Sequence, residues 1–374
     1  MLTFYTAGES HGRGIFAFLD GIPAGLPVSP GSIDADLSRR QKGYGRGGRM
    51  AIEQDRVDVL SGIRGGFTRG GPVRLSVGNR DFEIWRGFMD PWDIHPGREL
   101  HTPRPGHADL AGAARFGHTD LRNVLERSSA RETAGRVAAG GLLRQLLKAL
   151  GVEASSWVTR VGTASFDGPC RRDLRDGSSV FCPDAAATKA MEGQIDEAMS
   201  RGDTVGGEFR AVVSGLPAGI GSYTQWDQRL DTLVAGHLMS IPGIKAVQIG
   251  LGTACGMLPG SLVHDPILPG TPPKRGSNNA GGIEGGVSNG EPLVVTCTMK
   301  PIPTLKHGLD TIDIRDGSAV QASYERSDTC AVPAASVVGE AMLVIAVATA
   351  VLASFGLPDM AALERAFALQ RGAR

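Results

Sequence analysis

The feature that most constrains the fold of this 374-residue chain is one charged stretch that leads into a long helical pattern. It runs from Arg104 to Gly140 and holds six arginines and two histidines. Ser129 and Glu132 form an S-x-x-E capping box, which is typical of a helix start. Apolar residues then recur at i, i+4 spacing through Leu150, and Gly151 ends the pattern. Because a helix N-terminus favours anions, this pattern predicts either a phosphate site or merely the start of a structural helix.

Elsewhere in the chain, short strand-like and helix-like segments alternate without the regular spacing of βαβ units. Strands are expected at 2–6, 15–19, 57–60, 73–77, 152–163, 205–214, 246–251, 293–299, 311–315 and 319–324, and helices at 32–40, 185–201, 228–239 and from about Pro333. Ser32 is the expected cap of the first of these helices. No sequence repeat and no linker is apparent. The pattern predicts an α+β fold in a single domain, residues 1–374.

Two stretches do not fit any regular element. Residues 78–103 have little periodicity, and 258–282 is rich in proline, glycine and asparagine. Both are expected to be mobile loops. The second is expected to close over bound ligands, so that ligands would suppress proteolysis near Lys274 and Arg275.

The charge balance and the cysteines exclude several classes of protein. Lysine plus arginine equals aspartate plus glutamate, 39 each, which argues against a general nucleic-acid or membrane-surface binder. The five cysteines include no C-x-x-C pair, which fits a cytoplasmic protein without a zinc site. No secretion signal is apparent. The longest apolar run, Ala341 to Phe355, is too short to span a bilayer and predicts a buried helix.

Two histidines are candidates for proton transfer. His11 and His107 both lie in polar loops flanked by glycines rather than on apolar faces. Imidazole is the side chain best suited to moving protons near neutral pH. The two form an acid/base pair only if the fold brings them together, and each is otherwise structural or simply exposed. No histidine shows metal-ligand spacing, so no metal site is expected.

Many arginines lie in or beside glycine-rich loops. These are Arg39, Arg40, Arg46, Arg49, Arg104, Arg122, Arg127, Arg131 and Arg326. Guanidinium groups and glycine N–H groups both bind carboxylate and phosphate well. In a chain of zero net charge, such clusters indicate small ligands with several negative charges, and the alternative is a solvated basic surface. RNA binding through Arg-Gly-Gly pieces is a further alternative, but these pieces lie between strand-like segments with few aromatic residues.

At these residues the chain resembles the chorismate synthase family. Three signatures carry the resemblance: Gly8-Glu9-Ser10-His11-Gly12 with Asp20-Gly21-Ile22-Pro23, then Glu126 to Thr133, then Arg326-Ser327-Asp328 with Glu340-Ala341-Met342. The segments RRQKGYGRGGRM, RPGHADL, GSYTQWD, GGIEGGVSNGEP and MKPIPTL are also similar, so the resemblance covers about residues 3–345. The chain departs from the family at Phe16 and Phe18, and Pro242-Gly243 replaces a commoner Pro-Ala.

The resemblance implies a β-α-β sandwich, usually a homotetramer, and an enzyme of the shikimate pathway. The family converts 5-enolpyruvylshikimate 3-phosphate to chorismate and phosphate by a 1,4-anti elimination. It needs reduced FMN although the reaction has no net redox change. The substrate carries two carboxylates and a phosphate and FMN carries another phosphate, so one site must neutralise many charges.

The resemblance also implies roles for individual residues. The residues that it implies bind FMN are Arg127, Ser128, Ser129, Pro242, Gly243, Gly285, Lys300, Pro301, Ile302, Pro303, Thr304 and Arg326. The residues that it implies bind the anionic groups of the substrate are Arg40, Arg46, Arg49, Arg104 and Arg131. In some members, positions like Arg40 and Arg46 are also assigned to a nicotinamide cofactor. His11 would protonate the leaving phosphate, and His107 would stabilise or protonate the reduced flavin. Ser10, Ser129 and Asp328 would support proton movement near the flavin.

A competing class is a flavin oxidoreductase that consumes NADPH and reduces its substrate. The sequence has no recognisable dinucleotide fingerprint, but family members that reduce their own flavin have no separate domain for this either. Whether NADPH is a cofactor of this chain therefore stays open at the level of sequence.

Overall fold

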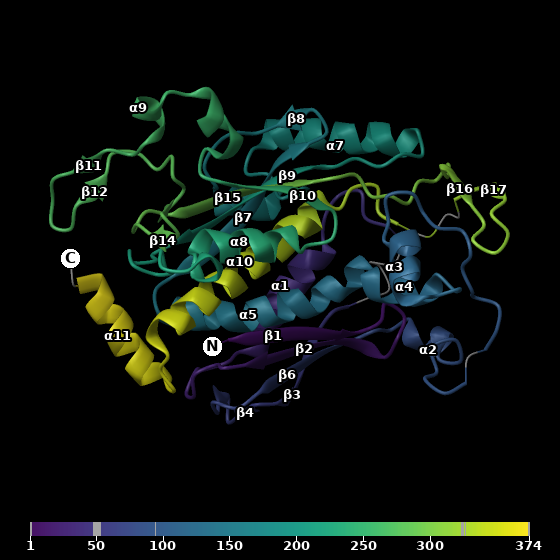
Figure 1. The fold of residues 1–374 in the computed structure, drawn as a ribbon, viewed down its shortest axis with the longest axis horizontal. Coiled ribbons are helices and arrows are strands. Elements are labelled where there is room, and N and C mark those ends of the chain that lie inside the picture. The colour runs from purple at the N-terminus through teal and green to yellow at the C-terminus, as the bar shows by residue number, and fades with distance from the viewer. Residues whose placement is uncertain (1, 48–53, 94, 323–324, 326, 373–374) are drawn as a thin grey trace.

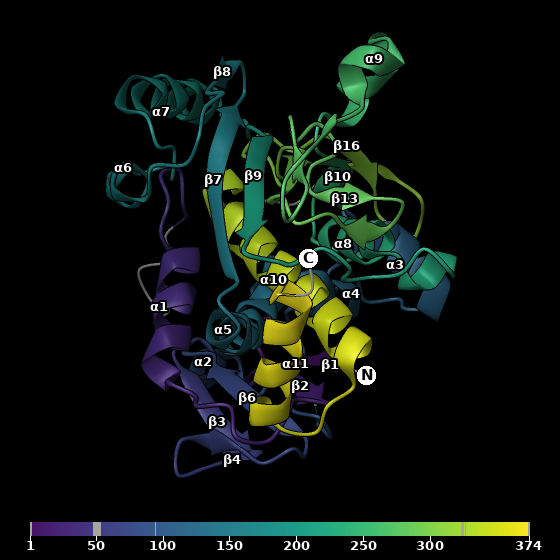
Figure 2. The ribbon, with the colours of Figure 1, turned by 90° about the vertical axis from the view of Figure 1, so that its left-hand side faces the viewer.

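Two antiparallel sheets enclose a layer of helices in the computed structural model, which describes residues 2–47, 54–93, 95–322, 325 and 327–372 (Figure 1). The first sheet has the strand order β1 (Thr3–Gly8), β2 (Gly14–Asp20), β6 (Val73–Gly78), β3 (Val57–Ser61). The second has the order β10 (Ile244–Ile249), β15 (Leu293–Met299), β9 (Gly207–Ser214), β7 (Glu153–Val161), β8 (Ala164–Ser165). The helices between them include α1 (Pro30–Gln41), α5 (Thr133–Ala149) and α10 (Val332–Phe355), and α8 (Leu230–Met239) packs on α10 (Figure 2). The predicted α+β sandwich is confirmed.

The apolar character of α10 explains its central place. Side chains are buried on nearly every side of this helix, as expected for a helix that lies between two sheets. By length and composition it could cross a membrane, yet 94% of its most apolar 18-residue window is buried inside the protein. The expected buried helix is confirmed. It begins at Val332 and is longer than the apolar run alone indicated.

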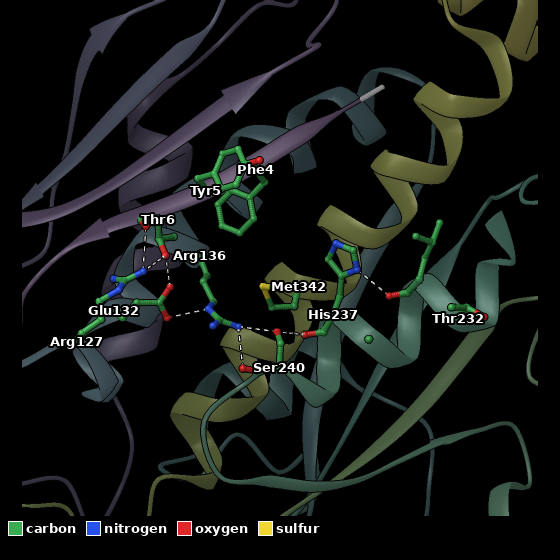
Figure 3. Close-up of a pocket in the computed structure, with 12 residues that line it drawn as sticks. Phe4, Tyr5, Thr6, Arg127, Glu132, Arg136, Thr232, His237, Ser240 and Met342 are labelled. Atoms are coloured by element: carbon green, nitrogen blue, oxygen red, sulfur yellow. Dashed lines mark hydrogen bonds and ion pairs between the residues drawn. The ribbon is translucent and has the colours of Figure 1, made fainter. Parts of the chain in front are cut away.

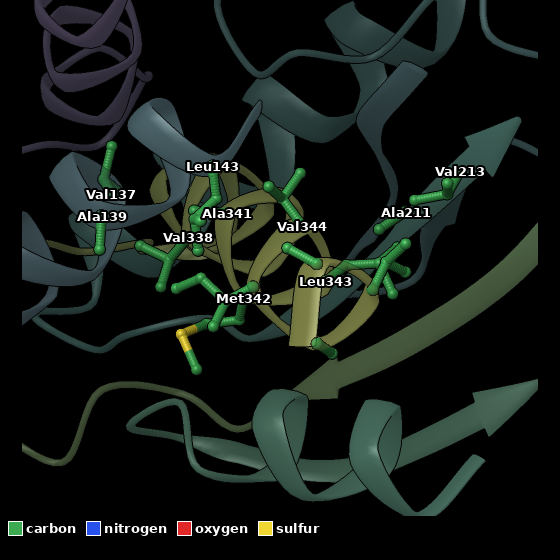
Figure 4. Packing of buried hydrophobic residues seen from close by; sticks show 14 of the residues in the cluster. Val137, Ala139, Leu143, Ala211, Val213, Val338, Ala341, Met342, Leu343 and Val344 are labelled. Carbon is green, nitrogen blue, oxygen red and sulfur yellow. The ribbon is translucent and has the colours of Figure 1, made fainter. Parts of the chain in front are cut away.

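The two central helices approach each other closely at Gly140 of α5 and Ala341 of α10. Figure 4 shows Val137 and Leu143 of α5 beside Val338 and Ala341 of α10. A Cβ atom added at Gly140 would lie 2.5 Å from the Cβ of Ala341 and 2.8 Å from its Cα. A residue without a side chain is therefore required here, because any larger one would force the helices apart.

We expect Gly140→Ala to lower the free energy of unfolding by about 1–3 kcal/mol, because the added methyl group overpacks this contact. Gly193 is a matched control, since it also lies inside a helix, α7 (Ala185–Ser200), but has open space where a Cβ would stand. Gly193→Ala is expected to raise the free energy of unfolding by up to about 1 kcal/mol. Urea unfolding of both variants measures the difference. Equal effects of the two substitutions would contradict the close approach.

The two sheets are built by an internal repeat, so the expectation that the chain contains none is wrong. The order β1-β2-β6-β3 in the first sheet corresponds to the order β7-β9-β15-β10 in the second. In chain order, two paired strands are followed by a helix, a third strand, a short hairpin and a fourth strand in both halves. A long helix closes each half, α5 in the first and α10 in the second. The sandwich is therefore two similar units that bury these helices against each other.

Matching sequences and hydrogen bonds support the repeat. Residues 21–26 read GIPAGL and residues 215–220 read GLPAGI, and the hairpin segments 62–73 and 282–293 read GIRGGFTRGGPV and GIEGGVSNGEPL. The Thr68 hydroxyl donates to Pro23 O (2.6 Å) and accepts from Leu26 N (2.9 Å). The Ser288 hydroxyl donates to Pro217 O (2.6 Å) and accepts from Ile220 N (2.9 Å). Some connections are long in one half only, such as 42–56 between α1 and β3 in the first half and 250–282 between β10 and β13 in the second. These differences in length hide the repeat when only the spacing of the elements is compared.

Several helix starts differ from expectation. Helix α1 has Ser29 rather than Ser32 at its N-cap position and begins at Pro30. The Ser129 hydroxyl does accept from Arg131 N (3.3 Å), but a 3-10 turn, Ala130–Glu132, precedes α5. The reciprocal half of the expected capping box is wrong, because the Glu132 carboxylate accepts from Thr6 and Arg136 instead.

The remaining predicted elements are observed close to their expected bounds. Helices that the sequence did not predict are α2 (Phe82–Trp85), α3 (Asp109–Phe116), α4 (Arg122–Ser128), α6 (Arg172–Gly177), α9 (Gly260–Val263) and α11 (Met360–Gly372). Short strand pairs that it did not predict are β4 (Ile63–Arg64) with β5 (Phe67–Thr68), β11 (Ile267–Leu268) with β12 (Lys274–Arg275), and β13 (Ile283–Glu284) with β14 (Val287–Ser288). The late strands are β16 (Asp310–Ile312) and β17 (Ala319–Gln321), and residues 323–324 of the second expected strand lie outside the described residues.

Candidate active site

The candidate site lies where three helix ends meet, beside α3 and α4 at the right of Figure 1. Arg40, near the end of α1, donates to the hydroxyl of Thr133 at the start of α5 (3.3 Å). Just beyond α1, the N–H of Gly47 donates to Asp328, which precedes α10 (2.7 Å). The repeat thus places the N-terminal ends of both central helices at one end of the molecule. Such ends favour anions.

Two buried arginines share one buried carboxylate in this region. Asp55 accepts from Arg40 (2.8 Å) and from Arg131 (2.6 Å), and Arg131 also donates to Asn79 (2.7 Å). Burial lowers the pKa of Arg40 to about 10, against the opposing charge of Asp55. Burial alone would raise the pKa of Asp55, but the two cations hold it below its usual range. The cluster keeps one positive charge more than it neutralises, which suits an anionic ligand. The sequence contained no signal for Asp55.

An arginine–aspartate ion pair also lies close to this cluster. Arg46 forms an ion pair with Asp328 at 2.7 Å. The structure therefore brings Arg46 together with a residue expected to support proton movement. Arg49 and Arg326 lie outside the described residues, so their predicted roles stay predictions.

His11 is held in a fixed orientation. Its Nδ1 lies 2.7 Å from Glu126 Oε1, and its backbone N–H donates to Glu126 Oε2 at 2.8 Å. The neighbouring Ser10 is buried, and its N–H donates to the Glu126 carbonyl at 2.9 Å. Trp85 stacks on the imidazole with ring centroids 4.0 Å apart, and the Arg98 guanidinium lies 4.1 Å from the Trp85 ring. The 78–103 segment therefore contributes a wall of the site.

His107 has its own carboxylate partner. Its Nδ1 lies 2.6 Å from Asp109 Oδ1, and Asp109 accepts three further bonds from Arg104, two from the side chain at 2.8 and 3.0 Å and one from the backbone N–H at 3.1 Å. Burial would raise the pKa of Asp109, but hydrogen bonds from His107 and Arg104 hold it well below its usual range. Arg104 also donates to Thr304 (3.3 Å), and Lys300 donates to the Gly106 carbonyl. The structure thus joins the 104–109 loop to the 300–304 segment.

The residues expected to hold FMN form two groups, and the first lies before α5. Arg127 donates to the carbonyls of Thr6 (3.0 Å) and Gly8 (3.2 Å) and to the Thr6 hydroxyl (2.8 Å). Ser128 donates to the Val124 carbonyl (2.7 Å), one turn back in α4. Ser129 follows as the residue that caps the 3-10 turn.

The second group lies at the end of the second sheet. The N–H of Lys300 donates to Gly243 O (3.0 Å), which places Pro242-Gly243 beside the 300–304 segment. The hydroxyl of Ser327 donates to Thr304 O (3.1 Å). Pro301, Ile302 and Pro303 complete the segment between these contacts.

An open groove of about 590 Å³ runs beside Arg127, between β1, α5, α8 and α10 (Figure 3). Arg136 crosses it and donates to Glu132 (2.8 Å) and to the Ser240 hydroxyl (2.8 Å). Burial lowers the pKa of His237, whose ring contacts the Leu233 carbonyl at 2.7 Å. The groove has the volume of a cofactor or ligand pocket and connects the Arg127 region with the residues before Pro242.

Gly285 does not join the other residues within one chain. The N–H of Leu230, at the start of α8, donates to Gly286 O (2.8 Å), whereas Gly243 follows the other end of that helix. A ten-residue helix spans about 15 Å, so Gly285 is remote from the Pro242-Gly243 peptide. Sequence similarity alone could not reveal this separation.

The 258–282 segment also lies away from the site, and it has anchors. Figure 1 shows α9, β11 and β12 at the end opposite α3 and α4. The Asp265 carboxylate accepts from the N–H groups of Asn279 (2.7 Å) and Ala280 (2.9 Å), and Arg275 pairs with Glu284 (2.6 Å). The expectation that this segment is a mobile loop that closes over the ligands stays a prediction. No cluster of three or more metal-ligating side chains occurs among the described residues.

The comparisons with known proteins agree with this architecture. The sequence model of the chorismate synthase family matches residues 2–352. Chorismate synthase of Desulforamulus reducens is 49% identical over 366 residues, covering 95% of both chains, and that of Desulforudis audaxviator is 51% identical over 372 residues, covering 97% of this chain and 95% of the relative. A solved structure described as "Crystal Structure of Chorismate Synthase" aligns with a TM-score of 0.80 at 36% identity, covering 100% of this chain and 98% of the other.

Fold, site and relatives together define a biosynthetic enzyme of the lyase kind. The chain belongs to the chorismate synthase family, and this family places it in the shikimate pathway of aromatic biosynthesis.

Proposed function

We propose that this enzyme converts 5-enolpyruvylshikimate 3-phosphate to chorismate and phosphate by a 1,4-anti elimination that depends on reduced FMN. The carbon–oxygen bond to phosphate and a carbon–hydrogen bond break, a double bond forms, and substrate and product differ by no net oxidation. The observation that carries the proposal is a set of groups suited to proton transfer and to anions: two histidine–carboxylate pairs, and a buried arginine cluster beside the start of α5.

The residues present fit a flavin nucleotide. The groove beside Arg127 has the volume of a cofactor pocket, and Arg127 and Arg136, which line it, supply cations. In the proposal, Arg127 to Ser129, Pro242-Gly243 and the 300–304 segment hold FMN. When bound, reduced FMN supplies reducing equivalents that the net reaction returns.

The chain's own residues then handle charge and protons. Arg40, Arg46, Arg104 and Arg131 bind the substrate anions, with their geometry fixed by Asp55, Asp328 and Asp109. His11 holds a proton for the oxygen of the leaving phosphate, and His107 holds one near the flavin. Ser10, Ser129 and Asp328 support proton movement between these positions.

Further elements of the proposal concern partners and location. The enzyme acts as a homotetramer in the cytoplasm, and Gly285 reaches a flavin site only if a neighbouring copy presents its β13–β14 hairpin there. NADPH is a cofactor if the chain reduces its own flavin. Arg40 is buried and already bonded to Asp55, so a nicotinamide nucleotide would have to bind at the cluster's outer surface.

The test uses purified protein and dithionite-reduced FMN under anaerobic conditions. Phosphate and chorismate should appear in equal amounts, because one elimination releases one of each. The control replaces reduced FMN with oxidised FMN in air and should show no turnover. Equal turnover under both conditions would contradict the proposal.

A further inference from the structure

The Glu126 carboxylate has an unusual setting for an acidic side chain. It lies in α4 and is only 4% exposed, whereas carboxylates are seldom buried unless they are paired. Among the residues that the structure describes, its closest lysine or arginine is Arg122, at 3.7 Å from Oε1, which is beyond hydrogen-bonding distance. Both carboxylate oxygens instead face residue 11, one at the backbone N–H and one at the ring.

These contacts fix the imidazole in two ways. An ionised carboxylate only accepts hydrogen bonds, so Nδ1 of His11 must carry the proton in the bond to Glu126. Stacking on Trp85, with 25° between the ring planes, limits tilt of the ring. Among the described residues, no hydrogen bond reaches the other nitrogen, Nε2. That nitrogen is therefore the one left to exchange a proton with a ligand.

We propose that Glu126 is a positioning residue that holds His11 in the Nδ1–H tautomer and so presents Nε2 to the reacting phosphate. This inference rests on the proposed function for its effect on turnover. The histidine–carboxylate arrangement serves the same purpose in hydrolases, where the carboxylate orients the base without touching substrate. His107 is arranged differently, because Arg104 shares its carboxylate, Asp109, and a change at Asp109 would disturb both side chains.

Glu126→Gln separates positioning from folding. The glutamine oxygen can still accept from the His11 N–H, which preserves the loop, but its amide group donates to Nδ1 and so favours the opposite tautomer. We expect turnover to fall by about 10-fold or more, because the orienting partner is lost and the opposite tautomer is favoured, with substrate and FMN binding within about threefold. Glu126→Asp, which keeps the charge, should retain more activity than Glu126→Gln.

A spectroscopic readout does not depend on activity. Protein labelled with ¹⁵N at histidine should show His11 protonated at Nδ1 in the wild type and at Nε2 in Glu126→Gln, with the signals assigned by their loss in His11→Gln. The matched control is Glu208→Gln on the second sheet, where Glu208 accepts from Arg160 and Thr298 and lies outside the site. It should change neither the tautomer nor turnover.

The outcomes separate this inference from the proposed function. If the wild type forms no chorismate, the proposed function is overturned. The tautomer spectra then still test whether Glu126 holds His11 in the Nδ1–H tautomer. An active wild type together with a tautomer unchanged in Glu126→Gln overturns the inference. So does a changed tautomer with turnover near the wild-type rate.

Discussion

Replacing His11 with alanine is expected to lower turnover by about two orders of magnitude or more, the usual scale for losing one acid/base group. Expulsion of phosphate requires its oxygens to be neutralised, and a proton does this better than a fixed charge alone. The same loss is expected for His107→Ala. Each ring is anchored by a buried carboxylate and neither ring contacts Asp55, so removal of the ring leaves the Arg40–Asp55–Arg131 cluster in place.

Binding should therefore survive these substitutions. We expect the affinities for FMN and substrate to stay within about tenfold of wild type, or ~1.4 kcal/mol. Equilibrium titration and single-turnover rates, measured separately for each variant, distinguish chemistry from binding. A variant that turns over at nearly the wild-type rate would show that its histidine is structural.

The largest expected effect on stability follows from loss of Glu340. This α10 carboxylate is 1% exposed and accepts from Arg39 (2.7 Å) and Ser156 (2.7 Å), and it pairs with Arg144 at 2.6 Å. It links α1, α5, α10 and β7 between the sheets. Glu340→Ala leaves Arg39, Arg144 and the more distant Arg175 without this partner in a poorly solvated place. We expect the free energy of unfolding to fall by about 3–5 kcal/mol.

The same group gives stability a defined dependence on pH. Burial would raise the pKa of Glu340, but the charges of Arg144 and Arg39 lower it from 4.5 to about 2. A carboxyl whose pKa is depressed by folding stabilises the fold above its unfolded value, and this stabilisation is lost as pH falls toward the folded value. Wild-type protein should therefore lose stability between about pH 4.5 and 2, and part of this loss should be missing in Glu340→Gln.

Urea unfolding at pH 7 and at several acidic pH values measures both effects. Glu208→Gln again serves as the control, because Glu208 is partly exposed and its ion pair with Arg160 lies at the surface, where such pairs contribute little. A Glu340→Ala variant as stable as Glu208→Gln at pH 7 would contradict the structural role of the network.

Periodicity predicted the fold better than the connections between its elements. β9, β15 and α10 carry regular burial patterns, and their type and place follow from local sequence. The internal repeat escaped detection because unequal insertions shift the matching segments relative to each other. The capping box was predicted only in part. Thr6, which is distant in sequence, and Arg136, which lies one turn further along the helix, both donate to the Glu132 carboxylate.

The candidate site, like the fold, was predicted only in part from the sequence. Histidines and arginines in glycine-rich loops could be recognised from the sequence as a group, but their carboxylate partners could not. Glu126 lies 115 residues from His11, and Asp55 joins arginines 15 and 76 residues away. Asp109 was within reach of sequence analysis, because it stands two positions after His107. Gly285 shows the opposite case, a motif match that one chain does not bring to the site.

The flavin spectrum during a single anaerobic turnover tests the central claim most directly. Enzyme, substrate and a stoichiometric amount of reduced FMN are mixed, and chorismate and flavin oxidation state are followed together. An elimination predicts full conversion of substrate to chorismate while the flavin ends reduced, as it began. Stoichiometric oxidation of the flavin, with a reduced product in place of chorismate, would contradict the account and show a flavin oxidoreductase instead.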